Sequence, residues 1–108
     1  MSIRDQILKA NDRPLKALEV PEWGTTIYLP TFSAAELVRI EELREDDQIP
    51  IGAFATVIIR DENGNPIFAP EDAAELSKKN GSILARIVVE CWKHNGIGEE
   101  ALDEAKND

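Results

Sequence analysis

The feature that most constrains the fold is a wide apolar stripe near the C-terminal end of the chain. The stripe consists of Ile83, Leu84, Ile87, Val88, Cys91 and Trp92. Residues three and four apart share one face of an α-helix, so this spacing predicts a helix from Ser82 to His94 packed against a core. Ser82 or Asn80 can cap its start, and Asn95-Gly96 is typical of a helix end.

A second helix is predicted over Phe32–Arg44. Ser33 and Glu36 have the spacing of a capping box, in which each side chain bonds a free backbone N–H of the other. One face of this helix carries the apolar residues Leu37, Ile40 and Leu43. The sequence therefore places another amphipathic helix before the C-terminal one.

The N-terminal third predicts a short helix followed by a β-hairpin. Residues 2–10 have Ser2 as a cap and an apolar side formed by Ile3, Ile7 and Leu8. Residues 15–30 favour two strands, with Trp23-Gly24 at the turn. A two-stranded hairpin is marginal in water by itself, so it must pack on the helices.

The middle of the chain gives a mixed signal over Ile51–Arg60. Its apolar residues have helical spacing, but the run Thr56–Ile59 is β-branched and would suit a strand. We favour helix here. A further helix is predicted from Pro70 to Lys78, because proline suits the first helical position and Glu71 favours the positive end of the helix dipole.

These elements predict the α+β class, as a mostly helical small single domain with an N-terminal β-hairpin. The 108 residues fit one domain, 1–108, with a helical core over 33–96. Residues 97–108 are expected to be an acidic tail with a frayed helix over Glu99–Lys106.

Net charge narrows the range of partners. The chain carries 21 acidic and 12 basic residues, a net charge of −9. This charge disfavours nucleic acid and anionic membranes as partners, because a surface that binds either one requires clustered lysine and arginine. It is compatible with a basic protein partner or with solubility alone. No run approaches the roughly 20 apolar residues of a membrane span.

The sequence contains little that indicates a catalytic site. Cys91 and His94 lie three apart on the predicted helix and could be neighbours. Cys91, however, belongs to the apolar stripe, and His94 suits the negative end of the helix dipole. We interpret them as core and cap, and predict no catalytic residue. As the only cysteine, Cys91 allows no intrachain disulfide, which favours a reducing cytoplasmic compartment.

A calcium loop is the nearest approach to a metal motif. Asp61, Asn63 and Asn65 alternate, and Asp72 stands at the closing position. Pro66 replaces the glycine that the sharp turn requires, so an Asx-rich turn is the preferred interpretation. We predict no metal or cofactor site.

Candidate partner-binding residues come from the hairpin and the second helix. They are Trp23, Ile27, Tyr28, Leu37, Ile40 and Leu43. Aromatic residues are enriched at interfaces, but core is the default interpretation of the three hairpin residues.

The order of segments resembles the tail assembly chaperones of long, non-contractile-tailed bacteriophages and prophages. The matching segments span nearly the whole chain: residues 2–10, Val20–Gly24, Ile27–Leu29, Phe32–Glu36, Arg60–Phe68, Glu71–Asp72 and His94–Ile97. One departure is visible, since Ala69-Pro70 stands where such proteins often have a threonine or serine cap.

The resemblance implies a non-catalytic role in the host cytoplasm. Such chaperones bind the tape measure protein while tail tube proteins polymerise around it, and they are absent from the mature virion. Many of their genes also produce a longer, frameshifted form, and the codons around Lys106 can encode a slippery heptamer. A homo-oligomer is compatible with the family.

Two other classes of function stay open at this point. An acidic DNA mimic that inhibits a host nucleic-acid-binding protein fits the negative charge and small size. An uncharacterised small enzyme would require a pocket around His94, Cys91 or a carboxylate pair.

Overall fold

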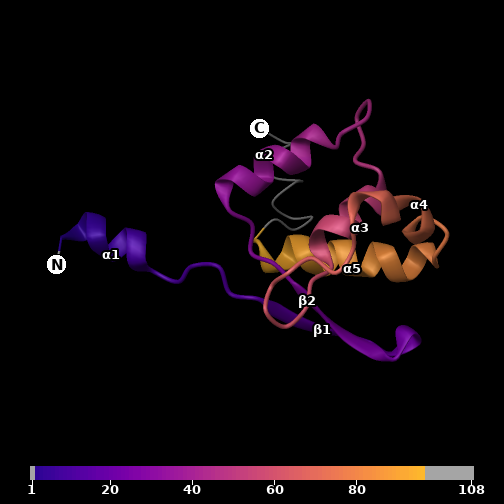
Figure 1. Ribbon diagram of the computed structural model, residues 1–108, viewed down its shortest axis with the longest axis horizontal. Helices are drawn as coiled ribbons and strands as arrows, with labels where there is room; N and C mark the ends of the chain where they lie inside the picture. Colours follow the sequence, from indigo (N-terminus) through magenta and orange to yellow (C-terminus); the bar gives the residue numbers. More distant parts are fainter. Residues whose placement is uncertain (1, 97–108) are drawn as a thin grey trace, which may run out of the picture.

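A computed structural model describes residues 2–96 of the chain. Its elements are α1 (Ile3–Lys9), β1 (Lys16–Val20), a 3₁₀ turn (Pro21–Trp23), β2 (Thr25–Leu29), α2 (Ala34–Glu42), α3 (Ile51–Ile58), a second 3₁₀ turn (Pro70–Asp72), α4 (Ala73–Leu76) and α5 (Gly81–His94). Helices and one antiparallel hairpin confirm the predicted α+β class (Figure 1). The predicted acidic tail over 97–108 lies outside the described residues.

The long helix α5 forms the centre of the core. Its side chains Ile83, Leu84, Ile87 and Cys91 are buried, and Val88 and Trp92 pack partly buried against the same cluster. The Asn80 side chain caps the helix by accepting hydrogen bonds from two backbone N–H groups, and Gly96 follows its end with a φ of 78°. The predicted stripe and the end at His94 are confirmed, and the helix begins one residue earlier than predicted, at Gly81.

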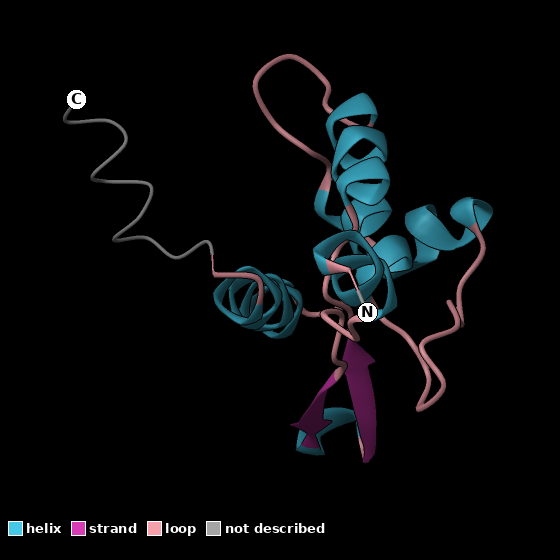
Figure 2. Ribbon diagram, turned by 90° about the vertical axis from the view of Figure 1, so that its left-hand side faces the viewer, coloured by secondary structure: helices cyan, strands magenta, loops and turns pink. Residues whose placement is uncertain are grey.

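The hairpin packs beneath the helices (Figure 2). β1 and β2 are antiparallel, with Lys16 opposite Leu29 and Val20 opposite Thr25. Gly24 has a φ of 67°, a left-handed conformation that glycine adopts without strain and that closes the turn after Trp23. Burial of Val20, Ile27 and Leu29 supplies the packing that an isolated hairpin lacks.

Helix α2 starts as predicted and ends earlier. Ser33 Oγ accepts from the Glu36 N–H at 3.1 Å, and Glu36 Oε1 accepts from the Ser33 N–H at 3.0 Å, so the capping box is confirmed. The helix ends at Glu42 instead of Arg44. Ile40 is its only buried residue, and α2 thus covers the core with a narrow contact.

Helix α3 resolves the ambiguous segment. Ile51–Ile58 is helical, and Phe54, Ala55 and Ile58 are buried in the core. The chain then becomes extended, and Arg60 exchanges backbone hydrogen bonds with Tyr28 of β2 at 3.0 and 2.9 Å. The helix prediction is correct up to Ile58, whereas Ile59 and Arg60 are extended, as the β-branched run favours.

The segment from Pro70 is less helical than predicted. A 3₁₀ turn precedes α4, which ends at Leu76 instead of Lys78. At Gly52 of α3, an added Cβ would lie 2.5 Å from the Ala73 carbonyl oxygen and closer still to Ser77 Oγ. The backbones of α3 and α4 therefore meet at a position that only glycine fits.

Helix α1 stands apart from the rest of the molecule (Figure 1). None of its residues is buried, although Ser2 caps it as predicted. We call residues 2–12 the arm. The residue after the arm, Arg13, attaches it to the domain: Arg13 donates to the Thr31 carbonyl oxygen at 3.0 Å and pairs with Glu36. Within residues 2–96, no helix is long and apolar enough to cross a membrane.

Candidate binding surface

Two apolar grooves flank α2. The first, the Leu37 groove, has a volume of about 650 Å³ and is lined by Leu37, Ile40, Ile49 and Trp92, with Glu41, Arg44, Asp47 and Gln48 at its polar part. The second, the Leu43 groove, has a volume of about 520 Å³; its apolar lining is Ile40, Leu43, Val57, Pro66, Phe68 and Pro70. Both grooves include Ile40, so α2 forms a wall of each.

The exposed apolar surface of α2 borders these grooves. Leu37 is 39% exposed and Val38 61%, whereas Ile40 is 2% exposed. Ile40 therefore belongs to the floor, and Leu37 and the half-buried Leu43 are the accessible side chains. A short helix with apolar residues on both sides is a geometry that suits an apolar stripe of another helix.

Aromatic rings support the floor of the Leu37 groove from below. The ring centroid of Trp92 lies 5.9 Å from that of Phe32 and 5.1 Å from that of Phe54, with the latter pair stacked. Phe32 and Phe54 meet edge to face at 6.4 Å. This cluster joins α3 and α5 to the start of α2 and makes the groove part of the folded core.

One carboxylate fixes the position of α2. Glu36 Oε2 accepts from Arg60 Nη2 at 2.8 Å, and Glu36 Oε1 pairs with Arg13. Burial raises the pKa of Glu36, but hydrogen bonds from Arg60 and the Ser33 N–H, with the charges of Arg60 and Arg13, outweigh it. The pKa falls from 4.5 to about 2. Glu36 is thus ionised at neutral pH and holds three segments together.

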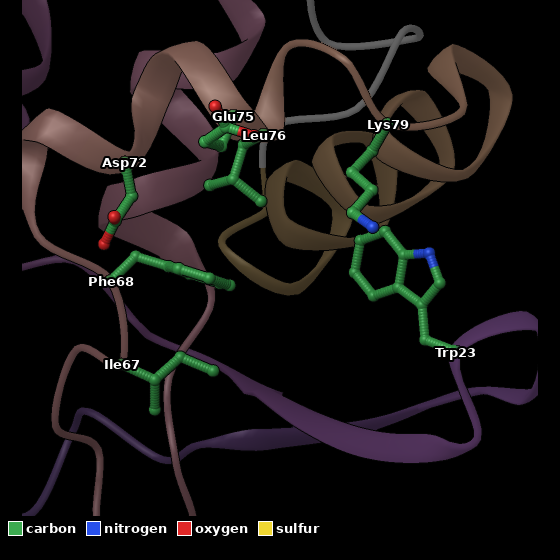
Figure 3. A pocket seen from close by; sticks show the side chains of 7 residues that line it. All are labelled: Trp23, Ile67, Phe68, Asp72, Glu75, Leu76 and Lys79. Carbon is green, nitrogen blue, oxygen red and sulfur yellow. The ribbon is translucent and has the colours of Figure 1, made fainter.

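The hairpin residues line other hollows. Trp23 borders a hollow of about 640 Å³, the Trp23 hollow, with Lys79 beside it and Ile67, Phe68 and Asp72 across from it (Figure 3). Ile27 is 3% exposed and lies in the core, and Tyr28 is half-buried beside Arg60. In Figures 1 and 2 the hairpin lies below the helices and α2 above them.

The structure therefore divides the six predicted residues. It brings Leu37 and Ile40 together on α2 with Leu43 directly after the helix, and it places Trp23 elsewhere. Sequence reasoning missed Ile49, Trp92 and Phe68, which complete the α2 grooves from three other segments. Trp92 was assigned to the apolar stripe, but the spacing of the stripe does not show that its side chain is partly exposed.

Cys91 and His94 do not form a catalytic pair. Burial raises the pKa of the Cys91 thiol to about 12, and the residue is 0% exposed. His94 points elsewhere, with Nε2 at 2.9 Å from both Thr31 Oγ1 and the Pro14 carbonyl oxygen. The ring thus fastens the chain before β1 to the end of α5, a role beyond the predicted helix cap.

The carboxylate of Asp61 is hydrogen bonded within its own turn. Asp61 Oδ1 accepts hydrogen bonds from the Asn63 and Asn65 N–H groups at 2.9 and 3.0 Å, which confirms the Asx turn. Asp72 Oδ2 accepts from the Ala69 N–H at 2.8 Å. Among residues 2–96, no group of three or more His, Cys, Asp or Glu side chains is placed to hold a metal ion.

Comparison with known proteins identifies a shared fold. No protein-family model matches the sequence, and no curated protein matches it. Among solved structures, the chain is similar to the tail assembly chaperone of bacteriophage HK97, with a TM-score of 0.60 and 17% sequence identity. The match covers 89% of this chain and 93% of the HK97 protein, so the whole fold is shared and not one motif.

Proposed function

We propose that this chain is a phage or prophage tail assembly chaperone that binds the tape measure protein through α2 and its two grooves. One observation carries the proposal: an α2 helix with exposed Leu37 and two apolar grooves lies on a fold shared with the HK97 tail assembly chaperone. The tail tube protein and a longer, frameshifted form of this chain are further proposed partners.

In the proposed mechanism, the chaperone covers an apolar stripe on a helix of the tape measure protein. A tape measure protein is a long helical chain whose apolar side would otherwise associate with other copies. Inserting apolar side chains on either side of α2 removes that surface from water, at about 25 cal/mol per Å² of apolar area. The chaperone's net charge of −9 keeps the complex soluble in the host cytoplasm, and the chaperone leaves before the virion is mature.

The charged surface argues against a DNA mimic. A mimic presents rows of free carboxylates in place of phosphates. Here Glu22 is held by Arg86 through two hydrogen bonds of 2.8 Å, and Glu41 is held by Arg44 at 2.9 and 3.0 Å. These two exposed carboxylates are each balanced by a guanidinium, so neither is free to take the place of a phosphate.

Co-expression with the tape measure protein of the same phage tests the proposal. We expect the chain to raise the soluble fraction of that protein and to co-purify with it. Leu37→Asp and Leu43→Asp should each reduce the recovered complex by about tenfold or more, because a charge would be buried in an apolar contact.

Val89→Asp is the matched control. Val89 is 42% exposed on α5, so this variant adds the same charge at an exposed aliphatic position outside both grooves. Equal solubility of the tape measure protein with and without the chain would refute the function. Equal loss with Val89→Asp would refute the α2 site while leaving the function standing.

A further inference from the structure

The polar contacts that fasten helix α2 to the domain all lie at its N-terminal end. Just before the helix, the Asn95 side chain accepts a hydrogen bond from the Phe32 N–H at 2.8 Å. In the first turn, Glu36 pairs with Arg60 at 2.8 Å. Within the described part of the chain, no hydrogen bond or ion pair joins residues 37–48 to a segment outside α2, its cap and the loop that follows. After its first turn, α2 is therefore held on the domain by apolar contacts alone.

These apolar contacts are narrow, because hollow space flanks them on both sides. Ile40 is the only buried residue of α2, and it borders both the Leu37 groove and the Leu43 groove. The facing walls of the grooves come from other helices, with Trp92 of α5 in the first groove and Val57 of α3 in the second. Ile40 thus separates two grooves that would otherwise form one apolar channel.

The loop after α2 leaves the C-terminal end of the helix room to move. Ile49 packs against the core again, so residues 43–48 are the free part of this loop. Fully extended, such a segment spans up to about 20 Å. In the structure it is folded back on itself, since Glu45 and Gln48 exchange backbone hydrogen bonds at 2.7 and 3.0 Å, and it projects from the domain (Figure 1). Opening of this short turn would free enough chain for the end of α2 to swing outward.

We propose that α2 is a hinged lid, which rotates about its N-terminal end and joins the two grooves into one apolar channel. The role of this motion rests on the proposed function: the apolar stripe of a tape measure helix enters the channel in the place that Ile40 occupies when the lid is closed. A helix with its side chains is about 10 Å across, so two turns of it occupy roughly 850 Å³, more than either groove encloses. In the open arrangement Leu37 and Leu43 contact the partner from the lid.

The accessibility of a thiol at position 40 tests the motion in the full-length chain, with no tape measure protein present. In Ile40→Cys, the introduced thiol is covered while the lid is closed and becomes accessible when it opens. Cys91 of the same molecule is 0% exposed in α5 and becomes accessible only when the core opens. We expect the introduced thiol to react with a disulfide reagent at least about 100-fold faster than Cys91. Its rate should be nearly independent of urea at low concentration, because opening of the lid exposes little surface.

Ile58→Cys is the matched control. Ile58 is 0% exposed in α3, so this variant places the same thiol at a buried isoleucine outside the lid. Its introduced thiol should react as slowly as Cys91 and should accelerate with urea in the same way. In both variants the rate of Cys91 reports any loosening of the core by the substitution, so the ratio of the two rates in one molecule is the measured quantity. A ratio near one in both variants would overturn the lid, since α2 would then open only with the whole domain.

The lid and the proposed function fail separately. If α2 stays closed while the chain still keeps the tape measure protein soluble, the lid is refuted and the function stands. If the thiol of Ile40→Cys reacts rapidly while the wild-type chain leaves the tape measure protein insoluble, the motion stands and the function is refuted.

Discussion

Helices α5 and α1 are built from the same local signals and have opposite environments. Each begins with a polar cap, Asn80 or Ser2, and each carries an apolar face. In α5 that face is buried in the centre of the core, whereas in α1 every residue is accessible. The cap and the apolar spacing thus determine where a helix forms, and they leave open what covers it.

The two helices differ in burial because different numbers of segments surround them. α5 is surrounded by the hairpin, α3 and the start of α2, which all contribute side chains to one cluster. α1 has no buried residue, and the chain after it is attached to the domain where Arg13 and Pro14 are hydrogen bonded to Thr31. The comparison predicts that perturbing α5 affects the whole domain, and that perturbing α1 leaves the stability of the domain unchanged.

Thiol reactivity should show the largest difference. In the variant Ile7→Cys, the introduced thiol is in water, while Cys91 is 0% exposed with a pKa of about 12. Cys91 can react with a disulfide reagent only after the core opens, at a cost of several kcal/mol. We expect two phases at pH 8, with the slow one at least about 10³-fold slower.

The wild type is the control for the assignment, since it should lack the fast phase. A Cys91 that reacts within tenfold of the introduced thiol would mean that α5 is not the stable centre of the domain.

Truncating one isoleucine in each helix should show the next largest difference. Ile87→Ala removes a side chain that is 0% exposed and should lower the free energy of unfolding by about 2–5 kcal/mol. Ile7→Ala should change it by no more than about 0.5 kcal/mol, because Ile7 is 66% exposed. Urea titration followed by Trp fluorescence measures both, and similar losses would show that α1 packs on its own domain.

Acid should have a smaller effect, located where the arm joins the domain. The pKa of Glu36 is about 2 when folded and 4.5 as a free side chain. A lowered pKa means that the ionised form stabilises the fold above pH 4.5 and that this contribution is lost as the pH falls toward 2. Allowing for partial exposure, its size is on the order of 1–3 kcal/mol.

Comparing the wild type with Glu36→Gln isolates this contribution. The difference in their free energies of unfolding should be largest at pH 7 and should shrink between pH 4.5 and 2. Glu22→Gln is the control, because Glu22 also has a pKa of about 2 but lies on the surface at the hairpin turn, where it pairs with Arg86. Parallel curves for wild type and Glu36→Gln would show that the ion pairs of Glu36 add no stability.

Local patterns predicted much of this fold. The stripe of α5, the capping box at Ser33, the turn at Gly24 and the Asx turn at Asp61 each depend on residues a few positions apart, and each is confirmed. The boundaries of α2 and α4 were too long, because helix ends depend on which backbone groups the following chain can satisfy.

The candidate site was predicted only in part. Leu37 and Leu43 follow from the amphipathic pattern of α2, but the pattern gave no means to separate accessible residues from Ile40, which lies in the floor. The Leu37 groove is completed by Ile49, from the loop after α2, and by Trp92 of the distant helix α5. The second role of Glu36, holding Arg60 and Arg13, likewise depends on contacts over more than twenty positions. Spacing within one helix carries no information about such contacts.

The glycine contact between α3 and α4 has a consequence for the Trp23 hollow. With no side chain at Gly52, nothing but hydrogen separates this helix from Ala73 and Ser77. A methyl group there would push α4 outward as a unit. Leu76 lies between Ala73 and Ser77 in the chain and lines the Trp23 hollow, so the shape of that hollow depends on Gly52, a residue that does not line it.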